Sequence, residues 1–354
     1  MEAENLFRRA LAIWEKTLGP NHPNVATCLS NIAFNYLRQE KYAEAEEFSQ
    51  RSLSIREQVL GPEHSEVAYS LIALGQAYGG QGKYAQTEPL YLRALAIREQ
   101  ALESDHPSVA LSLHVLGRLY HEQGKHAQAE PLYVRALSIR EQTLGPDHPS
   151  FATYLSNLGL LYHEQGKYAQ AEPLYQRVLS IGEKTNNLQT LDGAIAINNL
   201  AKLYHDQGRY VEAEPLYQRA MTIFEKAPQL IHPVVGQIRG NFAKLYHDQR
   251  RYAEAEPLYV SALAMWKQHQ PKNRKWATSM KNIAAFYYEQ GRYAEAEPLY
   301  QQALTICEQV LGLEDPDVAN ILESYAALLY KTKREAEAAE LEARVKGIRA
   351  KVQG

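Results

Sequence analysis

The chain of 354 residues contains only two cysteines, Cys28 and Cys307, which lie far apart in the sequence. This scarcity is typical of a reducing compartment and of buried, unreactive thiols rather than of a disulfide. No apolar run approaches the roughly 18 residues that a membrane-spanning helix needs. The N-terminus, MEAENLFRRALAIWEK, lacks the basic and then apolar order of a signal peptide. These absences predict a cytoplasmic protein that does not interact with a membrane.

The chain also lacks the charge excess and the motifs of several functional classes. Its net charge of −3 does not provide the basic surface of a nucleic-acid-binding protein. The Gly-Lys pairs at Gly82, Gly124 and Gly166 have neither the upstream glycine nor the following Ser/Thr of a P-loop. No nucleophile elbow, dinucleotide fingerprint or catalytic constellation is present. We therefore expect a protein that is not an enzyme, uses no cofactor and binds no nucleic acid.

One sequence segment recurs along almost the whole chain. YHEQGKYAQAEPLY at 162–175 appears 42 residues earlier as YHEQGKHAQAEPLY and 42 residues later as YHDQGRYVEAEPLY. His126 replaces the tyrosine after the Lys/Arg once, and the eighth copy has Glu335 there. The other copies carry that tyrosine in steps of 42, with one step of 41, at Tyr42, Tyr84, Tyr168, Tyr210, Tyr252 and Tyr293. A fixed period of this length indicates a repeat architecture.

Each copy is predicted to form two helices. In AIAINNLAKLY, residues 194–204, Ile197, Leu200, Ala201 and Tyr204 form one apolar stripe at helical spacing. The second helix, EAEPLYQRAMTIFEK, follows a QGR turn. Glycine and proline in linkers such as LGPEH are typical of a helix end and of the start of the next helix.

A helix pair cannot bury its apolar stripe alone, so each copy must pack against its neighbours. Small residues at one first-helix position would let the helices approach closely: Gly75, Gly117, Gly159, Ala201, Ala243 and Ala284. The sequence therefore predicts an all-α fold, a right-handed superhelical solenoid of eight helix pairs plus a leading helix.

The pattern resembles the tetratricopeptide repeat (TPR) family, whose signature is matched by Leu158, Gly159, Tyr162, Ala171 and Tyr175. The 42-residue period and the LGPDHP linkers are similar to the kinesin light chain type of this repeat. The resemblance covers essentially the whole chain. Kinesin light chains also carry a coiled-coil heptad segment, which is absent here, so a role in linking motor to cargo is not implied.

We expect a single TPR array over residues 1–354, with a leading helix at 3–18. The predicted repeats lie at about 22–60, 64–102, 106–144, 148–186, 190–227, 232–269, 274–311 and 316–351. The chain begins with a second helix that has no first helix before it. This beginning is either an N-terminal cap or, as we prefer, the result of cutting from a longer protein. The charged final helix suits the polar cap of a solenoid.

Two sets of histidines invite a metal or acid–base interpretation. His121, His163, His205 and His247 share one repeat position, but neighbouring repeats place them about 10 Å apart. A zinc ion reaches a histidine nitrogen at about 2 Å, so two repeats could hardly share one ion. His121 and His126 are five residues apart across a turn, unlike the HExxH motif. We therefore predict no metal site and interpret the shared-position histidines as half-exposed or packed between repeats. The linker histidines are expected to be turn or capping residues: His22, His64, His106, His148 and His232.

The resemblance implies a binding groove lined by first helices, in which an asparagine holds the backbone of an extended peptide. A carboxamide both donates and accepts hydrogen bonds, which suits that role. The alternative is an asparagine that bonds a neighbouring helix. We predict that the groove centres on the fourth to seventh repeats, and that its peptide-binding residues are Asn157, Asn199, Asn241 and Asn282, with Asn198 beside them, and the basic residues Arg118, Lys202, Lys244 and Lys281. The basic stripe favours an acidic ligand, although acidic residues one turn further on would partly neutralise it.

Three functions remain open. The first and preferred one is an interaction scaffold that binds an extended segment of a partner protein. The second is a structural array that associates end to end through the apolar face of the first helix, formed by Leu6, Phe7, Ala10 and Ile13. The third is a regulatory segment of a larger enzyme or signalling protein.

Overall fold

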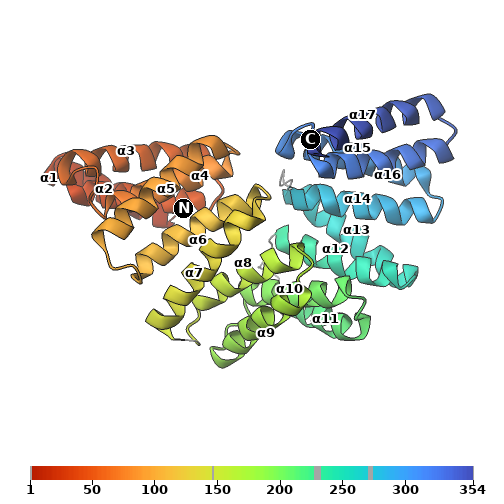
Figure 1. Ribbon diagram of the computed structural model, residues 1–354, viewed down its shortest axis with the longest axis horizontal. Helices are drawn as coiled ribbons and strands as arrows, with labels where there is room; N and C mark the ends of the chain where they lie inside the picture. The colour runs from red at the N-terminus through yellow and green to blue at the C-terminus, as the bar shows by residue number, and fades with distance from the viewer. Residues whose placement is uncertain (1, 146, 227–232, 270–273, 354) are drawn as a thin grey trace. The chain divides into compact units, whose positions relative to one another are not determined.

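The computed structural model of the protein describes residues 2–145, 147–226, 233–269 and 274–353. These residues form seventeen α-helices and no strand (Figure 1). The helices are α1 (Glu2–Leu18), α2 (Pro23–Leu37), α3 (Tyr42–Leu60), α4 (Val67–Gly80), α5 (Tyr84–Ala101), α6 (Pro107–Glu122), α7 (His126–Leu144), α8 (Phe151–Glu164), α9 (Tyr168–Lys184), α10 (Leu191–Asp206), α11 (Tyr210–Lys226), α12 (Pro233–Asp248), α13 (Tyr252–His269), α14 (Arg274–Glu289), α15 (Tyr293–Leu311), α16 (Pro316–Lys331) and α17 (Glu335–Gln353).

The helices divide into two compact units, residues 1–185 and residues 186–354. The first unit contains α1 and the four pairs from α2/α3 to α8/α9, and the second contains the four pairs from α10/α11 to α16/α17. Within each unit the first helices of successive pairs also contact one another, as α2, α4, α6 and α8 do, and likewise α10, α12, α14 and α16. The all-α class and the eight pairs with a leading helix are therefore confirmed.

Two of the linker histidines, His22 and His106, cap a first helix, and two others bond within the turn before the helix, so both predicted roles occur. The Nδ1 atom of His22 accepts a hydrogen bond from the backbone amide of Asn24 at 3.1 Å, and His106 does the same for Ser108 at 3.0 Å. A proline follows each of these two histidines, at the first position of the helix. His64 and His148 make the same bond, whereas His232 lies outside the described residues.

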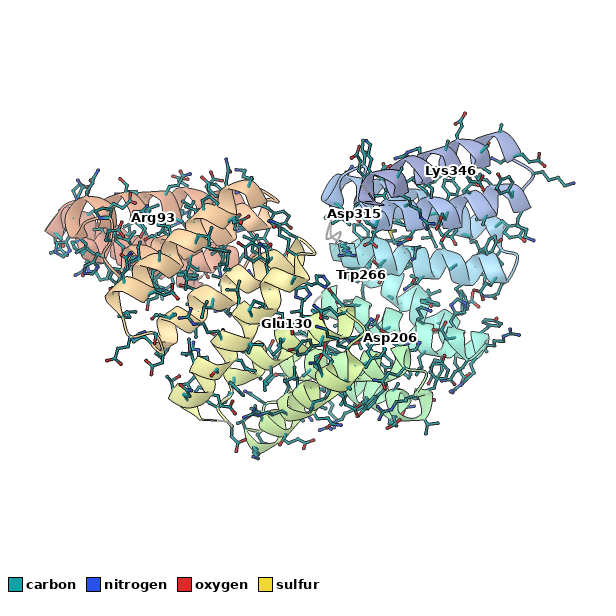
Figure 2. All side chains as sticks on the ribbon, in the orientation of Figure 1. Arg93, Glu130, Asp206, Trp266, Asp315 and Lys346 are labelled. Carbon is teal, nitrogen blue, oxygen red and sulfur yellow. The ribbon has the colours of Figure 1, made fainter. Side chains whose placement is uncertain are left out.

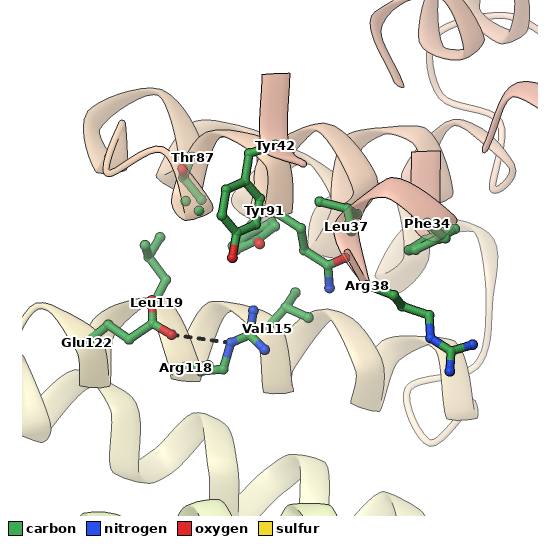
Figure 3. A pocket seen from close by; sticks show the side chains of 13 residues that line it. Phe34, Leu37, Arg38, Tyr42, Thr87, Tyr91, Val115, Arg118, Leu119 and Glu122 are labelled. Atoms are coloured by element: carbon green, nitrogen blue, oxygen red, sulfur yellow. Dashed lines mark ion pairs between the residues drawn. The ribbon is translucent and has the colours of Figure 1, made fainter. Parts of the chain in front are cut away.

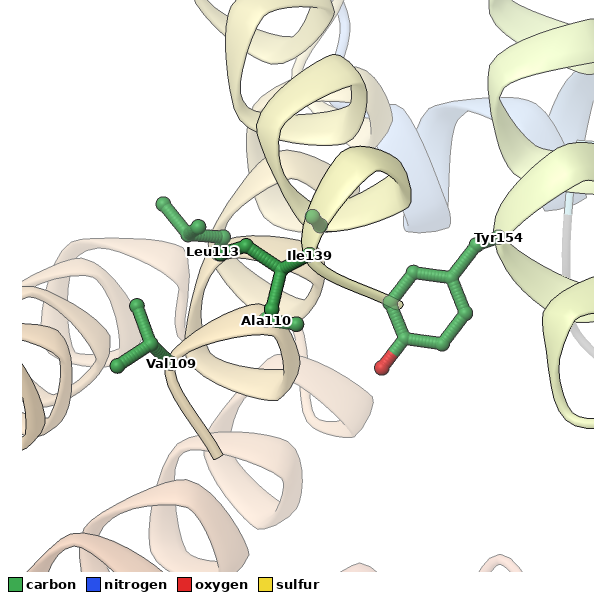
Figure 4. Packing of buried hydrophobic residues seen from close by; sticks show 6 residues of the cluster. Val109, Ala110, Leu113, Ile139 and Tyr154 are labelled. Atoms are coloured by element: carbon green, nitrogen blue, oxygen red, sulfur yellow. The ribbon is translucent and has the colours of Figure 1, made fainter. Parts of the chain in front are cut away.

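At the column of small residues, a tyrosine ring from the second helix of the same pair packs against the first helix. A Cβ atom placed on Gly159 would lie 2.9 Å from the Tyr175 ring, and one on Gly75 would lie 2.4 Å from the ring of Tyr91. These tyrosines are almost fully buried. Successive pairs then close over an aliphatic core; in Figure 4, Tyr154 of α8 packs against the cluster of Val109, Ala110, Leu113, Ala136 and Ile139.

The same polar contact between neighbouring repeats recurs along the chain, and it is made by three residues of the repeated segment. Glu130 of α7 accepts hydrogen bonds from the Tyr162 hydroxyl at 3.3 Å and from Lys167 at 2.9 Å, both in the next repeat. Lys167 also lies over the Tyr162 ring, 5.4 Å from its centroid. The AEP glutamate, the first-helix tyrosine and the GK/GR cation thus join neighbouring repeats. Glu130 is labelled in Figure 2, and the equivalent acceptors include Glu88, Glu214 and Glu297.

Both cysteines are buried and neither forms a disulfide, in agreement with the sequence-based expectation of inert thiols. Burial raises the pKa of the Cys307 thiol to about 12, with Asp317 and Asp315 adding to the shift. No helix in the described part of the chain is both long and apolar enough to cross a membrane.

Candidate functional site

The predicted asparagines of the second unit lie on α10, α12 and α14. Asn199, Asn241 and Asn282 are half-buried, whereas Asn198 is only 2% exposed. Asn241 donates a hydrogen bond from Nδ2 to Oδ1 of Asn198 at 3.0 Å, which joins α12 to α10. Asn198 and Asn241 therefore bond a neighbouring helix, the alternative role considered for this column. Asn199 and Asn282 keep a partly exposed carboxamide.

Asn157 of α8 also bonds the preceding first helix. Its Nδ2 atom lies 2.7 Å from Nε2 of His114 in α6. Burial, and then the nearby Arg118 and Arg140, lower the pKa of His114 to about 3. His114 is therefore neutral, and its unprotonated Nε2 accepts the amide proton of Asn157.

Three of the four predicted basic residues are paired with an acid one turn further along the same helix. Lys202 lies 2.6 Å from Asp206 and Lys244 lies 2.8 Å from Asp248. Arg118 makes a looser pair with Glu122, at 3.5 Å. Lys281 immediately precedes Asn282, whereas Lys202 and Lys244 follow their asparagines by three residues, so Lys281 occupies a different position of the repeat. The positive charge of the stripe is consequently offset at Arg118, Lys202 and Lys244.

The histidine column forms pairs with carboxylates of the next repeat. Nε2 of His205 lies 2.8 Å from Asp248, and that of His247 lies 3.0 Å from Glu289. Both imidazoles are buried, at 7% exposed, so the expectation of half-exposed side chains is wrong for them and packing between repeats is confirmed. Burial opposes ionisation of Asp248, but bonds from His205 and Lys244 outweigh it and lower the pKa of the carboxyl. The sequence signal for these pairs is an acid 42 or 43 residues after each histidine.

A hollow of about 440 Å³ lies on the first-helix surface of the first unit. Its lining comes from helices α2 to α6 and the residue after α2: Phe34, Leu37, Arg38, Tyr42, Gln76, Gly79, Gly80, Thr87, Tyr91, Val115, Arg118, Leu119 and Glu122. In Figure 3 the Arg118–Glu122 pair on α6 faces Tyr42 and Tyr91 across this space. Arg118 is the one predicted binding residue among them, and the other eight lie elsewhere.

The hollow exists because two glycines interrupt the histidine–carboxylate pattern. Gly79 occupies the repeat position of the paired histidines, and Gly80 occupies that of the carboxylates. A Cβ atom on Gly79 would approach only Thr87, at 3.8 Å, so this position has open space beside it. The ring of Tyr42 covers Gly80, where a Cβ atom would lie 2.2 Å from the ring. The sequence places the groove in the fourth to seventh repeats instead, because a missing side chain gives no positive signal.

Profile comparison assigns these repeats to a known family. A tetratricopeptide repeat profile matches residues 1–58, 29–86, 80–142, 121–184, 193–268 and 277–350, and a second profile of the same description matches residues 241–310. The chain belongs to the tetratricopeptide repeat family. A search of curated proteins returned no match.

Solved structures with the same fold include a variant of a putative kinesin light chain with nearly identical TPR-like repeats from Podosopora anserina. It is 27% identical, with 59% of this chain and 98% of that chain covered at a TM-score of 0.51. BtubC (BKLC) from P. vanneervenii is 21% identical over 66% of this chain and 92% of its own, with a TM-score of 0.53. The Rap conjugation gene regulator of plasmid pLS20, solved with the Phr* peptide, is 15% identical over 94% of this chain and 96% of its own, with a TM-score of 0.61. The chain is thus a TPR solenoid similar to kinesin light chain repeats.

Proposed function

We propose that this protein is a non-catalytic scaffold that binds an extended, acidic segment of a partner protein on its first-helix surface. The observation that carries the proposal is the hollow between α2 and α6, where Arg118 and Arg38 lie beside apolar side chains and tyrosines. A rigid, preformed surface orders only the ligand, which limits the entropy lost on binding. TPR arrays are typical interaction scaffolds, and one structural neighbour was solved with a peptide.

The charges around the hollow favour an acidic residue of the ligand. Arg118 is 46% exposed on its side chain, and its pair with Glu122 is long for an ion pair. A ligand carboxylate would make a shorter, bidentate contact with the guanidinium than Glu122 does. Gln76 lies on the adjacent helix and offers a carboxamide to the backbone of a bound peptide.

The asparagine–lysine stripe of the second unit is the second proposed contact region, as the sequence indicated. Asn199 and Asn282 are the carboxamides available there, and Lys202, Lys244 and Lys281 supply the cations. Because Lys202 and Lys244 are already paired, an acidic ligand must compete with Asp206 and Asp248. We therefore expect this region to contribute less to affinity than the hollow does.

Panning a random-peptide display library on the purified protein tests the proposal. Enriched peptides should be acidic, and Arg118→Ala should weaken their binding by about tenfold, the loss of one charge-assisted hydrogen bond. Lys202→Glu with Lys244→Glu should weaken it further at low salt. Arg135→Ala is the matched control, because Arg135 is 44% exposed on second helix α7 and also ion-paired. Equal binding by all these variants would reject the first-helix surface as the site.

End-to-end self-association is a second candidate function. On α1, Phe7 and Ala10 pack against the buried cluster of α2, whereas Leu6 and Ile13 are 59% and 57% exposed. Two exposed aliphatic side chains on one helix favour a contact with another copy. Light scattering over a concentration series, comparing the parent with Leu6→Glu plus Ile13→Glu, would detect an assembly that depends on this face.

A further inference from the structure

One repeat carries a histidine at the position where six other copies have a tyrosine beside the histidine column. His126 takes the place of the tyrosine that follows the Lys/Arg in six other copies. It is the first residue of α7, directly after the turn that follows α6. The five-residue spacing from His121 excludes a metal site on one continuous helix, but the turn folds the two rings together. Their centroids are 5.6 Å apart at an interplanar angle of 80°.

A carboxylate from the next repeat completes a cluster of three. Nε2 of His121 lies 2.9 Å from Oε2 of Glu164, the last residue of α8. The ligand atoms of His121, His126 and Glu164 all lie within 4.8 Å of one another. Throughout the described ranges this is the one group of three or more His, Cys, Asp or Glu side chains with such geometry.

We propose that His121, His126 and Glu164 form a binding site for a divalent transition-metal ion, with Zn²⁺ as the preferred ion. Two imidazoles and one carboxylate, with water in a fourth position, are a known ligand set of zinc. A tetrahedral ion needs its ligand atoms about 3.3 Å apart, so the most distant pair must close by at most about 1.5 Å. Glu164 is 45% exposed and His126 is only partly buried, so small side-chain rotations can provide that movement.

The surroundings of His121 suit a metal ligand. Its imidazole is 9% exposed, which fixes the ring, and its Nδ1 lies 3.5 Å from the Tyr133 hydroxyl. A proton on Nδ1 would point to that oxygen and leave Nε2 unprotonated for the ion, the usual arrangement around a metal-bound histidine. Without metal, a proton on Nε2 is donated to Glu164. Metal binding would require the other neutral tautomer, with the proton on Nδ1, and would replace the hydrogen bond to Glu164 by coordination through the ion.

A bound ion would cross-link two neighbouring repeats. It would connect α6 and the start of α7 to α8 in the following repeat, at a position where a hydrogen bond already joins them. Because binding requires the folded arrangement of three helices, the ion would stabilise the folded state in proportion to its affinity.

The second unit contains two matched comparison sites. His205 pairs with Asp248, and His247 pairs with Glu289, but tyrosine holds the third position in both. The Tyr210 ring lies 5.7 Å from that of His205, nearly the same separation as between the rings of His126 and His121. The identity of this one residue should therefore decide whether a histidine–carboxylate pair binds metal.

Isothermal titration of the untagged, metal-free protein with ZnCl₂, together with thermal melting, tests the site. We expect one tightly bound ion and a higher Tm with zinc. His126→Tyr installs the residue of the other repeats, so it should fold normally and bind zinc at least about tenfold more weakly, the minimum loss seen even for outer partners of a metal. Glu164→Gln should show the same loss and serves as an independent variant if His126→Tyr unfolds. Circular dichroism confirms folding.

Tyr210→His provides the converse test, because it adds the missing ligand beside His205 and Asp248. It should create a second zinc-binding site, whereas Tyr210→Phe should not. A parent protein that binds no stoichiometric zinc would overturn the proposal. So would folded His126→Tyr and Glu164→Gln variants that bind zinc as the parent does, or a Tyr210→His variant that gains no second ion.

Discussion

One position of the second helix is filled in contrasting ways by two pairs of the first unit and two pairs of the second. In the first unit this position carries Arg56 and Arg98, both almost completely buried. Arg98 donates to the backbone oxygen of Ser108 at 2.8 Å and to the Ser112 hydroxyl at 3.0 Å. In the second unit the same position carries Phe224 and Trp266 in the first two pairs, both buried without a charge, and Cys307 and Arg349 in the last two. The repeat framework therefore accepts either a hydrogen-bonded cation or an aromatic ring at the junction between pairs.

The first helices of the two units differ as well. In the second unit, His205 and His247 each bond a carboxylate of the next repeat, which joins α10 to α12 and α12 to α14. Between α4 and α6 of the first unit, Gly79 provides no such bond and a hollow remains. The same backbone thus carries bonds between first helices in one place and a recess in another, where glycines replace the bonding side chains.

Trp266→Ala should have the largest effect on stability. Trp266 is 2% exposed and stacks on Trp276, with ring centroids 6.5 Å apart. Truncation leaves a large cavity, and such changes cost about 3–5 kcal/mol. Denaturant unfolding monitored by circular dichroism measures the loss. An effect under about 1 kcal/mol would show that the aromatic junction is not what holds α13 to α14.

Gly159→Leu should have the next largest effect. The Tyr175 ring lies where the new side chain would begin, and overpacking of a well-packed core costs about 1–3 kcal/mol. Gly159→Ala is the control, since alanine occupies this position at Ala201 in the second unit. An unchanged Tm for Gly159→Leu would contradict close contact at this column.

The periodicity of the sequence predicted the helix pairs, the small column and the histidine caps, because each depends on residues within one repeat. The bond between His205 and Asp248 depends on residues 43 positions apart, so it requires the relative register of two repeats. The hollow was not predicted because Gly79 and Gly80 contribute space rather than a side chain. The half-buried asparagines were assigned to a ligand, whereas the structure shows Asn157 and Asn241 bonded to neighbouring first helices.

Comparing Asn241→Ala with Asn199→Ala should show which carboxamide stabilises the fold and which is available to a ligand. Asn241→Ala leaves the buried Asn198 without its donor, at a cost of about 1 kcal/mol. Asn199 is partly exposed, and its nearest amide contact, with Asn198, is long at 3.5 Å, so its truncation should change stability by less than about 0.5 kcal/mol. Urea unfolding of both variants provides the comparison. Equal losses would mean that the column acts as one structural network.

Gly79→His should change stability less than Asn241→Ala does, and it supplies the histidine that is missing between α4 and α6. The new imidazole would stand 43 residues before Glu122, the same separation as between His205 and Asp248. Asp248 accepts from His205 and Lys244 together, so Glu122 can accept from the new histidine while it remains paired with Arg118. A gain of less than about 1 kcal/mol is expected, from one hydrogen bond and from replacing a helical glycine. Gly79→Ala measures the glycine contribution alone, and a double-mutant cycle with Glu122→Gln isolates the new pair. A coupling free energy near zero would show that the first unit does not share the register of the second.

The same variant should lower the affinity for peptides that occupy the hollow, because the imidazole fills the space beside Thr87. Peptide affinity that stays unchanged in a variant with measurable coupling would place the ligand outside the hollow.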